Sequence, residues 1–165
     1  MKRIISVLME NEPGALSRIV ALFSQRNYNV DSLCVAPTHD PSLSRLTITS
    51  HGDDKVIEQI TKQVNKLIDV LKVADLTDAS HVERELMLIK VATPTDKSRA
   101  EVVRNVDIFR GKIVDVQTNN YTIEITGTSD KLDVFAKTLA ATADVVESSR
   151  TGICGLARGD RALRP

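Results

Sequence analysis

The sequence predicts an α+β protein with two βαββαβ ferredoxin-like domains, each an antiparallel sheet with its helices on one face. Short apolar runs rich in Ile and Val alternate with segments whose apolar residues recur at helical spacing. The order strand, helix, strand, strand, helix, strand occurs twice in 165 residues, and a polar stretch at 77–83 separates the two copies. We therefore predict a first domain at 1–76 and a second at 77–165.

The first domain opens with the apolar run 3–9, and the pair Pro13-Gly14 predicts the turn that ends it. A helix is expected from Ala15, because the next apolar residues share one helical face: Leu16, Ile19, Val20 and Phe23. Composition then predicts two strands, a helix after an Asp cap, and a closing strand, at 27–37, 43–50, 53–67 and 68–76.

The second domain repeats this order of elements with a different amino-acid sequence. Strands are expected at 83–93, 112–117, 120–127 and 144–150. Helices are expected at 96–111, where Gly111 ends the pattern, and at 129–143. The tail 151–165, which contains Arg158, Arg161 and Arg164, is predicted to have no regular structure.

The sheet face away from the helices needs a cover. The run "IISVLM" has apolar residues on both faces of the strand, unlike a strand with one side in water. In so small a unit, another copy in the same chain or a second chain is the expected cover. We therefore predict a homodimer or a higher homo-oligomer.

Charge and composition exclude several classes of protein. Lys+Arg and Asp+Glu both number 22, so the net charge gives no reason to expect nucleic acid or a membrane surface as partner. No apolar run approaches the about 18 to 20 residues of a membrane-spanning helix, and the start lacks a signal-peptide pattern. Two cysteines, Cys34 and Cys154, form neither a CxxC pair nor a disulfide framework. These observations predict a cytoplasmic protein.

The turn "NEPGAL" can be interpreted in two ways. The first N-H groups of the helix, at Gly14, Ala15 and Leu16, lack intrahelical partners and suit a carboxylate. Pro13 is expected in the first helical turn, and the amide of Asn11 could donate to a carboxylate and accept from an ammonium. Aliphatic neighbours, Leu8 and Val30 among them, suit a small aliphatic amino acid. On spacing alone, however, a plain helix start is the simpler interpretation.

Longer stretches of the sequence resemble a known family. The segment "NEPGALSRIVALFSQRNYNVDSLCVAPTHDPSLSRLTI" is similar to the ACT domain of the small, regulatory subunits of acetolactate synthase (acetohydroxyacid synthase). The segments "HVERELMLIKV", "IFRGKIVDV" and "GLARGD" resemble the second domain and C-terminus of the same family. The resemblance covers essentially the whole chain.

The resemblance implies a non-catalytic subunit that activates the large catalytic subunit of acetolactate synthase, a transferase, and confers feedback inhibition by valine in branched-chain amino acid biosynthesis. Thiamine diphosphate, Mg and FAD are then expected on the catalytic subunit, and no cofactor on this chain. The family's valine site lies between the ACT domains of a dimer. Its elements correspond to Asn11, Gly14, Ala15 and Leu16 of one chain and to Asn29 and Val30 of the other. Whether leucine or isoleucine also binds is left open.

Other functions were compared with this one. His39-Asp40, and His51 with Asp53 and Asp54, lack the three or four ligands at fixed spacing that a metal site needs. Three histidines form no catalytic constellation, and aromatics, at 3%, are too few for an RNA-recognition domain of the same topology. The alternative is a free-standing ACT-type amino-acid sensor that acts on another partner. The basic tail and the open sheet face of the second domain are the expected contacts with the catalytic subunit; the alternative for the tail is that it is disordered or covers the dimer.

Overall fold

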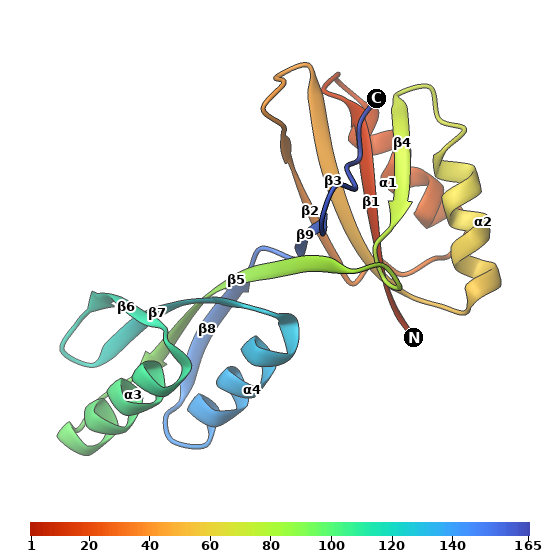
Figure 1. Ribbon diagram of the computed structural model, residues 1–165. Coiled ribbons are helices and arrows are strands. Elements are labelled where there is room, and N and C mark those ends of the chain that lie inside the picture. The colour runs from red at the N-terminus through yellow and green to blue at the C-terminus, as the bar shows by residue number, and fades with distance from the viewer. The chain divides into compact units, whose positions relative to one another are not determined.

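The computed structural model describes residues 1–165 and consists of two compact units (Figure 1). The first comprises residues 1–83 and 153–165, and the second comprises residues 84–152. The second unit is therefore an insertion within the first. This differs from the predicted division at 1–76 and 77–165, because the tail belongs to the first unit.

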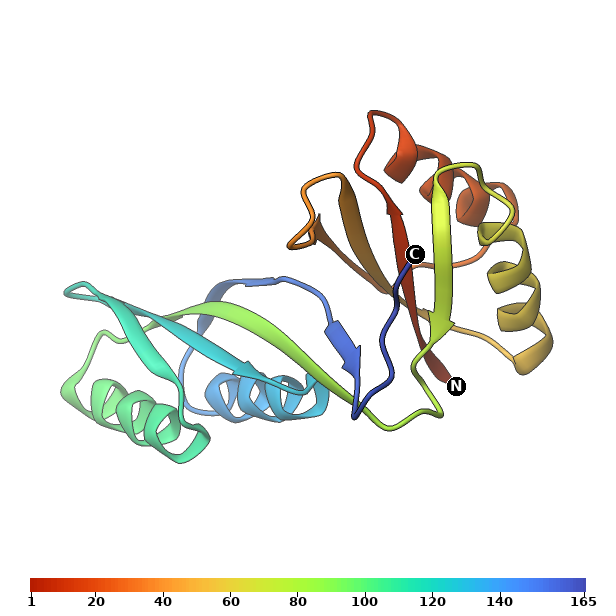
Figure 2. The same ribbon diagram turned by 45° about the horizontal axis from the view of Figure 1, so that its top comes forward.

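The first unit has the predicted βαββαβ order. Its elements are β1 (Lys2–Glu10), α1 (Ala15–Gln25), β2 (Ser32–Pro37), β3 (Leu43–His51), α2 (Asp54–Val64) and β4 (Val70–Asp75). The strands form an antiparallel sheet in the order β2-β3-β1-β4. Both helices lie on one face of this sheet (Figures 1 and 2). The predicted α+β class is confirmed.

The core of the first unit lies between the sheet and these helices. Alternate residues of β1, namely Ile5, Val7 and Met9, are buried against Ile19 and Phe23 of α1. Each such side chain contributes about 1.5 to 3 kcal/mol when fully buried. The other face of β1 carries Ile4 and Leu8, which are also buried.

The tail covers the second face of this sheet, and here the sequence prediction was wrong. Residues Cys154–Ala157 form a ninth strand, β9, which pairs with β5 (His81–Ala92). The backbone N-H of Arg158 donates to the carbonyl of Ser80 at 2.9 Å. The remaining residues run across the sheet on the side away from α1 and α2 (Figure 2). The apolar face that seemed to need a second copy is thus partly covered by the chain itself.

The second unit repeats the topology. After β5 come α3 (Asp96–Phe109), β6 (Lys112–Val116), β7 (Asn120–Gly127), α4 (Ser129–Ala140) and β8 (Val145–Arg150). The strand order is β6-β7-β5-β8, and the core includes Met87, Ile89, Phe135 and Leu139. The open face of this sheet has no covering segment within the unit, and β8 is exposed throughout. No helix of the structure is long and apolar enough to cross a membrane.

Candidate effector-binding site

The predicted site begins at the N-terminus of α1, which differs from every other helix start in the chain. Gly14 occupies the N-cap position with φ 87°, and no side chain accepts a hydrogen bond from the first turn. Side-chain oxygens of Asp53, Thr95 and Thr128 cap α2, α3 and α4. A helix start without a side-chain cap leaves N-H donors for another acceptor. The turn therefore has the donor arrangement that an anionic ligand requires.

The turn itself is tighter than the sequence suggested. The helix begins at Ala15, so Pro13 lies before the helix. The prediction that Pro13 lies in the first helical turn was wrong. The cause is Gly14, whose left-handed conformation turns the chain sharply just before the helix. The N-H of Ala15 donates to the carbonyl of Glu12 at 3.2 Å, so the free donors lie further along the first turn.

Arg18 places a cation beside the turn, and the sequence analysis did not identify this residue. Its Nη1 lies 2.8 Å from the position that a Cβ on Gly14 would occupy. Its guanidinium also binds Asp69, with Nε 2.5 Å from Oδ2 and Nη2 3.0 Å from Oδ1. This hydrogen bond lowers the pKa of Asp69 even though partial burial opposes the charge. The spacing of four residues from Gly14, one helical turn, was the available signal.

Asn11 holds the turn against the loop between β2 and β3. Its backbone N-H donates to the carbonyl of Ser42 at 2.7 Å, and its Nδ2 donates to the carbonyl of Pro41 at 2.9 Å. The side-chain Oδ1 accepts no hydrogen bond from the chain and remains available to an ammonium donor. Asn11 and Gly14 are both exposed.

Ala15 and Leu16 contribute mainly backbone to this end of the site. The side chain of Ala15 is buried in the core, and that of Leu16 packs partly against it. Leu8, which we had expected beside the turn, lies on the opposite face of the sheet, because alternate residues of a strand point to opposite sides.

Asn29 and Val30 lie at the other end of the domain. They fall between α1 and β2, where the Asn29 Nδ2 donates to Asp31 Oδ1 at 2.7 Å and the Asn29 carbonyl accepts from Ser50 Oγ at 2.7 Å. Val30 packs partly against the core. The exposed amide of Asn29 is thus fixed by its neighbours and faces solvent in a single chain.

The register of the sheet separates the two halves of the predicted site. Residue Leu43 of β3 pairs with Glu10, next to Asn11, whereas His51 pairs with Lys2, next to the Asn29 end. The nine residues of β3 span about 26 Å at about 3.3 Å per residue. Asn11 and Asn29 of one chain therefore do not meet.

The residues considered for metal binding have structural roles instead. Asp53 caps α2, Asp54 pairs with the buried Arg3, and His51 hydrogen-bonds to Asp31. No group of three or more His, Cys, Asp or Glu side chains is arranged to hold a metal ion.

Comparison with known proteins gives a consistent result along the whole chain. Residues 5–72 match the model of the AHAS small subunit-like ACT domain, and residues 84–159 match that of the small subunit of acetolactate synthase. The acetolactate synthase isozyme 3 small subunit of Salmonella typhimurium is 56% identical over 164 residues, covering 99% of this chain and 100% of that protein. Its namesake from Escherichia coli is 55% identical with the same coverage. The crystal structure of the acetolactate synthase small subunit from Thermotoga maritima superimposes with a TM-score of 0.87 at 41% identity, covering 98% of this chain and 99% of that one.

Proposed function

Because the chain belongs to the family of acetolactate synthase small subunits, we propose that it activates the large catalytic subunit and confers feedback inhibition by valine. The observation that carries this proposal is the helix start at Gly14, which has no side-chain cap and lies beside the guanidinium of Arg18. It occurs in the ACT domain, where the family resemblance implies an amino-acid effector.

Valine satisfies the chemistry of this turn. Its carboxylate would accept from the free N-H groups of α1, with favourable interaction from the helix dipole of about 0.3 to 1 kcal/mol when exposed and up to about 2 when partly buried. Its ammonium would donate to the Oδ1 of Asn11, which no group of the chain occupies. Its short side chain would contact the aliphatic Leu16 and, from a second chain, Val30.

A second copy completes the site. Asn11 and Asn29 lie at opposite ends of β3. In a two-fold dimer whose two ACT domains run in opposite directions, the Asn11 end of each chain therefore lies next to the Asn29 end of the other. Such a dimer has two equivalent sites. Neither exists in a single chain.

This arrangement couples valine to assembly and to the catalytic subunit. A ligand held by both chains stabilises the associated state by RT ln(1 + [L]/Kd), about 2.7 kcal/mol at a hundredfold excess over Kd. The bound state can then favour one orientation of the two chains over another. We propose that the catalytic subunit, which holds thiamine diphosphate, Mg and FAD in the cytoplasm, responds to that orientation.

The open face of the second unit is our candidate contact for the catalytic subunit. Leu88 is exposed on β5, and Lys90 beside it pairs with Glu147 of β8 at 2.9 Å. The tail is a weaker candidate than we expected, because residues 153–165 belong to the first unit and lie over its sheet. Leu88→Asp should reduce activation of the catalytic subunit while the fold is retained. Unchanged activation would exclude this face.

Mixing two inactive variants tests the composite site. Asn11→Ala and Asn29→Ala should each retain activation but abolish valine inhibition. After denaturation and joint refolding in equal amounts, half of the dimers contain one chain of each kind. One of the two sites in such a dimer is intact, so about a quarter of all sites should bind valine in a calorimetric titration. No recovery on mixing would mean that both residues serve the same site within one chain. Loss of activation in the single variants would mean that they only support the fold.

A further inference from the structure

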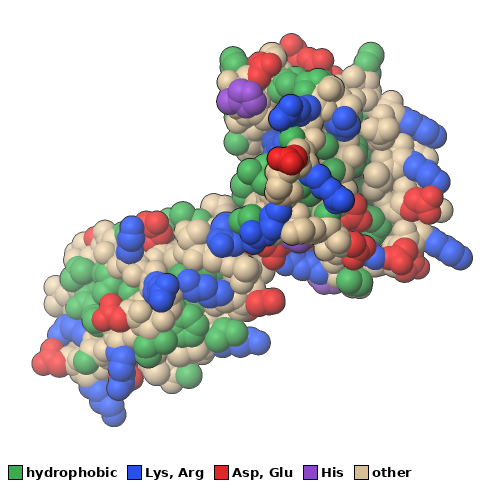
Figure 3. Space-filling model, viewed as in Figure 1, with side chains coloured by type: hydrophobic (Ala, Val, Ile, Leu, Met, Phe, Trp, Pro, Cys, Tyr) green, Lys and Arg blue, Asp and Glu red, His purple; other side chains and the backbone are tan.

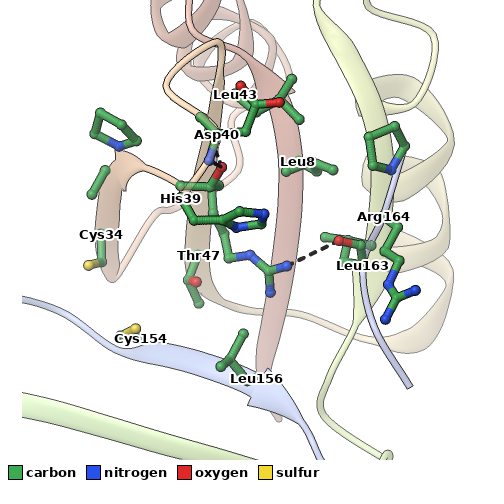
Figure 4. Close-up of a pocket in the computed structure, with 15 residues that line it drawn as sticks. Leu8, Cys34, His39, Asp40, Leu43, Thr47, Cys154, Leu156, Leu163 and Arg164 are labelled. Atoms are coloured by element: carbon green, nitrogen blue, oxygen red, sulfur yellow. Dashed lines mark hydrogen bonds between the residues drawn. The ribbon is translucent and has the colours of Figure 1, made fainter. Parts of the chain in front are cut away.

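A cavity on the open face of the first sheet is separate from the turn at Gly14. It measures about 680 Å³ and is bounded by β2 and β3, by the loop between them, and by the tail (Figure 4). Its apolar walls include Leu8, Leu43, Leu156 and Leu163. A mainly aliphatic cavity of this size suits a small organic molecule.

Arg45 supplies a cation to this cavity without an acidic partner. Its only side-chain hydrogen bond is from Nη2 to the backbone carbonyl of Leu163 at 3.3 Å (dashed line, Figure 4), and it forms no ion pair. The guanidinium is partly buried, and this burial lowers the pKa of Arg45. A partly buried guanidinium has five donors, so most of them remain available to an anion.

A second unpaired group lies beside Arg45. Ser6 is completely buried, and its hydroxyl has no hydrogen-bond partner. It lines an adjoining cavity of about 320 Å³ that Arg45, Leu156 and Leu163 also line. Buried hydroxyls without a partner are uncommon in native proteins and are often explained by a water or ligand.

The cavity also holds one acidic side chain, Asp40, of which one oxygen is hydrogen-bonded. Asp40 Oδ1 accepts from Ser42 N at 3.0 Å and from Ser42 Oγ at 2.7 Å. Arg164 of the tail adds a second cation to the lining. Basic and hydrophobic side chains lie side by side over this part of the first unit in Figure 3. The lining therefore combines aliphatic walls with two guanidinium groups and the carboxylate of Asp40.

We propose that this cavity is a second binding site, for a small aliphatic monocarboxylate. Its carboxylate binds Arg45 in place of the Leu163 carbonyl, and its hydrocarbon part lies among the four leucines. In this cavity a guanidinium binds the carboxylate, whereas at the turn beside Gly14 the free backbone N-H groups of α1 are the proposed donors. The two sites therefore bind a carboxylate through different groups.

The loop between β2 and β3 links the two sites. Thr38, His39 and Asp40 of this loop line the cavity. The carbonyls of Pro41 and Ser42, in the same loop, accept the two hydrogen bonds from Asn11. A carboxylate that moves the loop on binding would shift the Asn11 amide and so change the affinity of the Gly14 turn for its ligand. A ligand at the turn would change the affinity of the cavity by the same factor.

Titration of the full chain with 3-methylbutanoate tests the proposal, because this probe has a carboxylate and a branched aliphatic chain but no ammonium. Binding should be saturable in calorimetry, and Arg45→Met should weaken it at least tenfold, since the substitution keeps the aliphatic stem but removes the charge. Arg26→Met, at an exposed position away from the cavity, is the matched control and should bind normally. The neutral amide of the same acid should not bind.

Two further measurements locate the site. Ala36→Phe places a bulky side chain at an exposed position of the cavity lining and should also prevent binding. This variant tests the proposal even if Arg45→Met does not fold. Gly14→Asp, which should exclude a carboxylate from the turn, should bind the probe normally. Binding that is lost in Gly14→Asp but kept in Arg45→Met would place the carboxylate at the Gly14 turn and overturn the proposal, as would no saturable binding to the wild-type chain.

Discussion

The two units share one topology but start their first helices differently. In the second unit, Thr95 and Ser98 form a reciprocal capping box at α3. In the first unit, the equivalent helix α1 starts at Gly14 with no side-chain cap. A side-chain cap typically stabilises a protein by about 1 kcal/mol, so the first unit forgoes stability at this position. The difference leaves N-H donors of α1 without a side-chain acceptor, as the proposed effector site requires.

The open sheet faces differ as well. In the first unit the tail crosses this face, and Ile4 and Leu8 are almost fully buried. In the second unit no segment covers the corresponding face, and Leu88 is 42% exposed. The first sheet is therefore covered by its own chain, whereas the open face of the second sheet is left exposed.

The largest expected effect distinguishes the two faces. Leu8→Ala removes a buried side chain and should lower the free energy of unfolding by about 2 to 4 kcal/mol, whereas Leu88→Ala should change it by less than about 0.5. Chemical denaturation of both variants gives the comparison. Equal effects would show that the tail does not pack on the first sheet in solution.

The next effect concerns the uncapped turn. Gly14→Asp places a carboxylate where the ligand's own should bind, and its Cβ would approach Arg18 Nη1 within 2.8 Å. Valine inhibition should weaken by at least about a hundredfold, while activation of the catalytic subunit persists. The left-handed backbone adds strain of about 1 to 2 kcal/mol.

Gly159→Asp is the matched control for that strain. Gly159 has φ +69°, and a side chain there would meet nothing within 4 Å. If this variant also loses valine inhibition, backbone strain rather than the anion site explains the effect of Gly14→Asp.

An acid-sensitive network in the second unit should have a smaller effect. Burial disfavours the charge of Glu85, but the hydrogen bonds and charge of Arg150, together with hydrogen bonds from Ser129 and the Gly152 N-H, outweigh it, and the pKa of Glu85 is held below its ordinary value. Folding then favours the ionised form, so its contribution is present above pH 4.5 and is lost as the pH falls through the lowered pKa.

Glu85→Gln should remove about 2 kcal/mol of stability at pH 7. It should also flatten the dependence of unfolding free energy on pH below 4.5. Denaturation curves from pH 3 to 7 measure both quantities. An unchanged slope would assign the acid sensitivity to other carboxylates.

The smallest effect tests the capping comparison directly. Thr95→Ala removes the capping box and should lower stability by about 1 kcal/mol without changing valine inhibition. Thermal unfolding and an inhibition curve measure the two quantities. A change in inhibition would contradict the assignment of the effector to α1 alone.

Periodicity predicted the order of all the elements except β9. The run of β1 and the helical face of α1 depend on local patterns, and local patterns are readable in sequence. The strand β9 has only four residues between glycines and arginines, and its packing depends on a sheet face formed by β1 and β3 at the other end of the chain. No local signal specifies that contact.

The site was predictable to a similar degree. The position of the turn followed from Pro13-Gly14, but the helix start at Ala15 depends on the φ of Gly14. The engagement of Asn11 with Pro41 depends on the β3 register, which brings a distant loop alongside the turn. The sequence identified the hydrogen-bond donors of the turn, but not the residues that contact them in the fold.

The insertion of the second unit into the first also affects biosynthesis. Residues 1–83 leave the ribosome well before residues 153–165, which cover the first sheet. At about 5 to 20 residues per second, the nascent ACT sheet remains uncovered for several seconds while the second unit is made. During this interval Ile4 and Leu8 are open to chaperones or to other nascent chains. The tail therefore covers the first sheet only after the whole of the second unit has been synthesised.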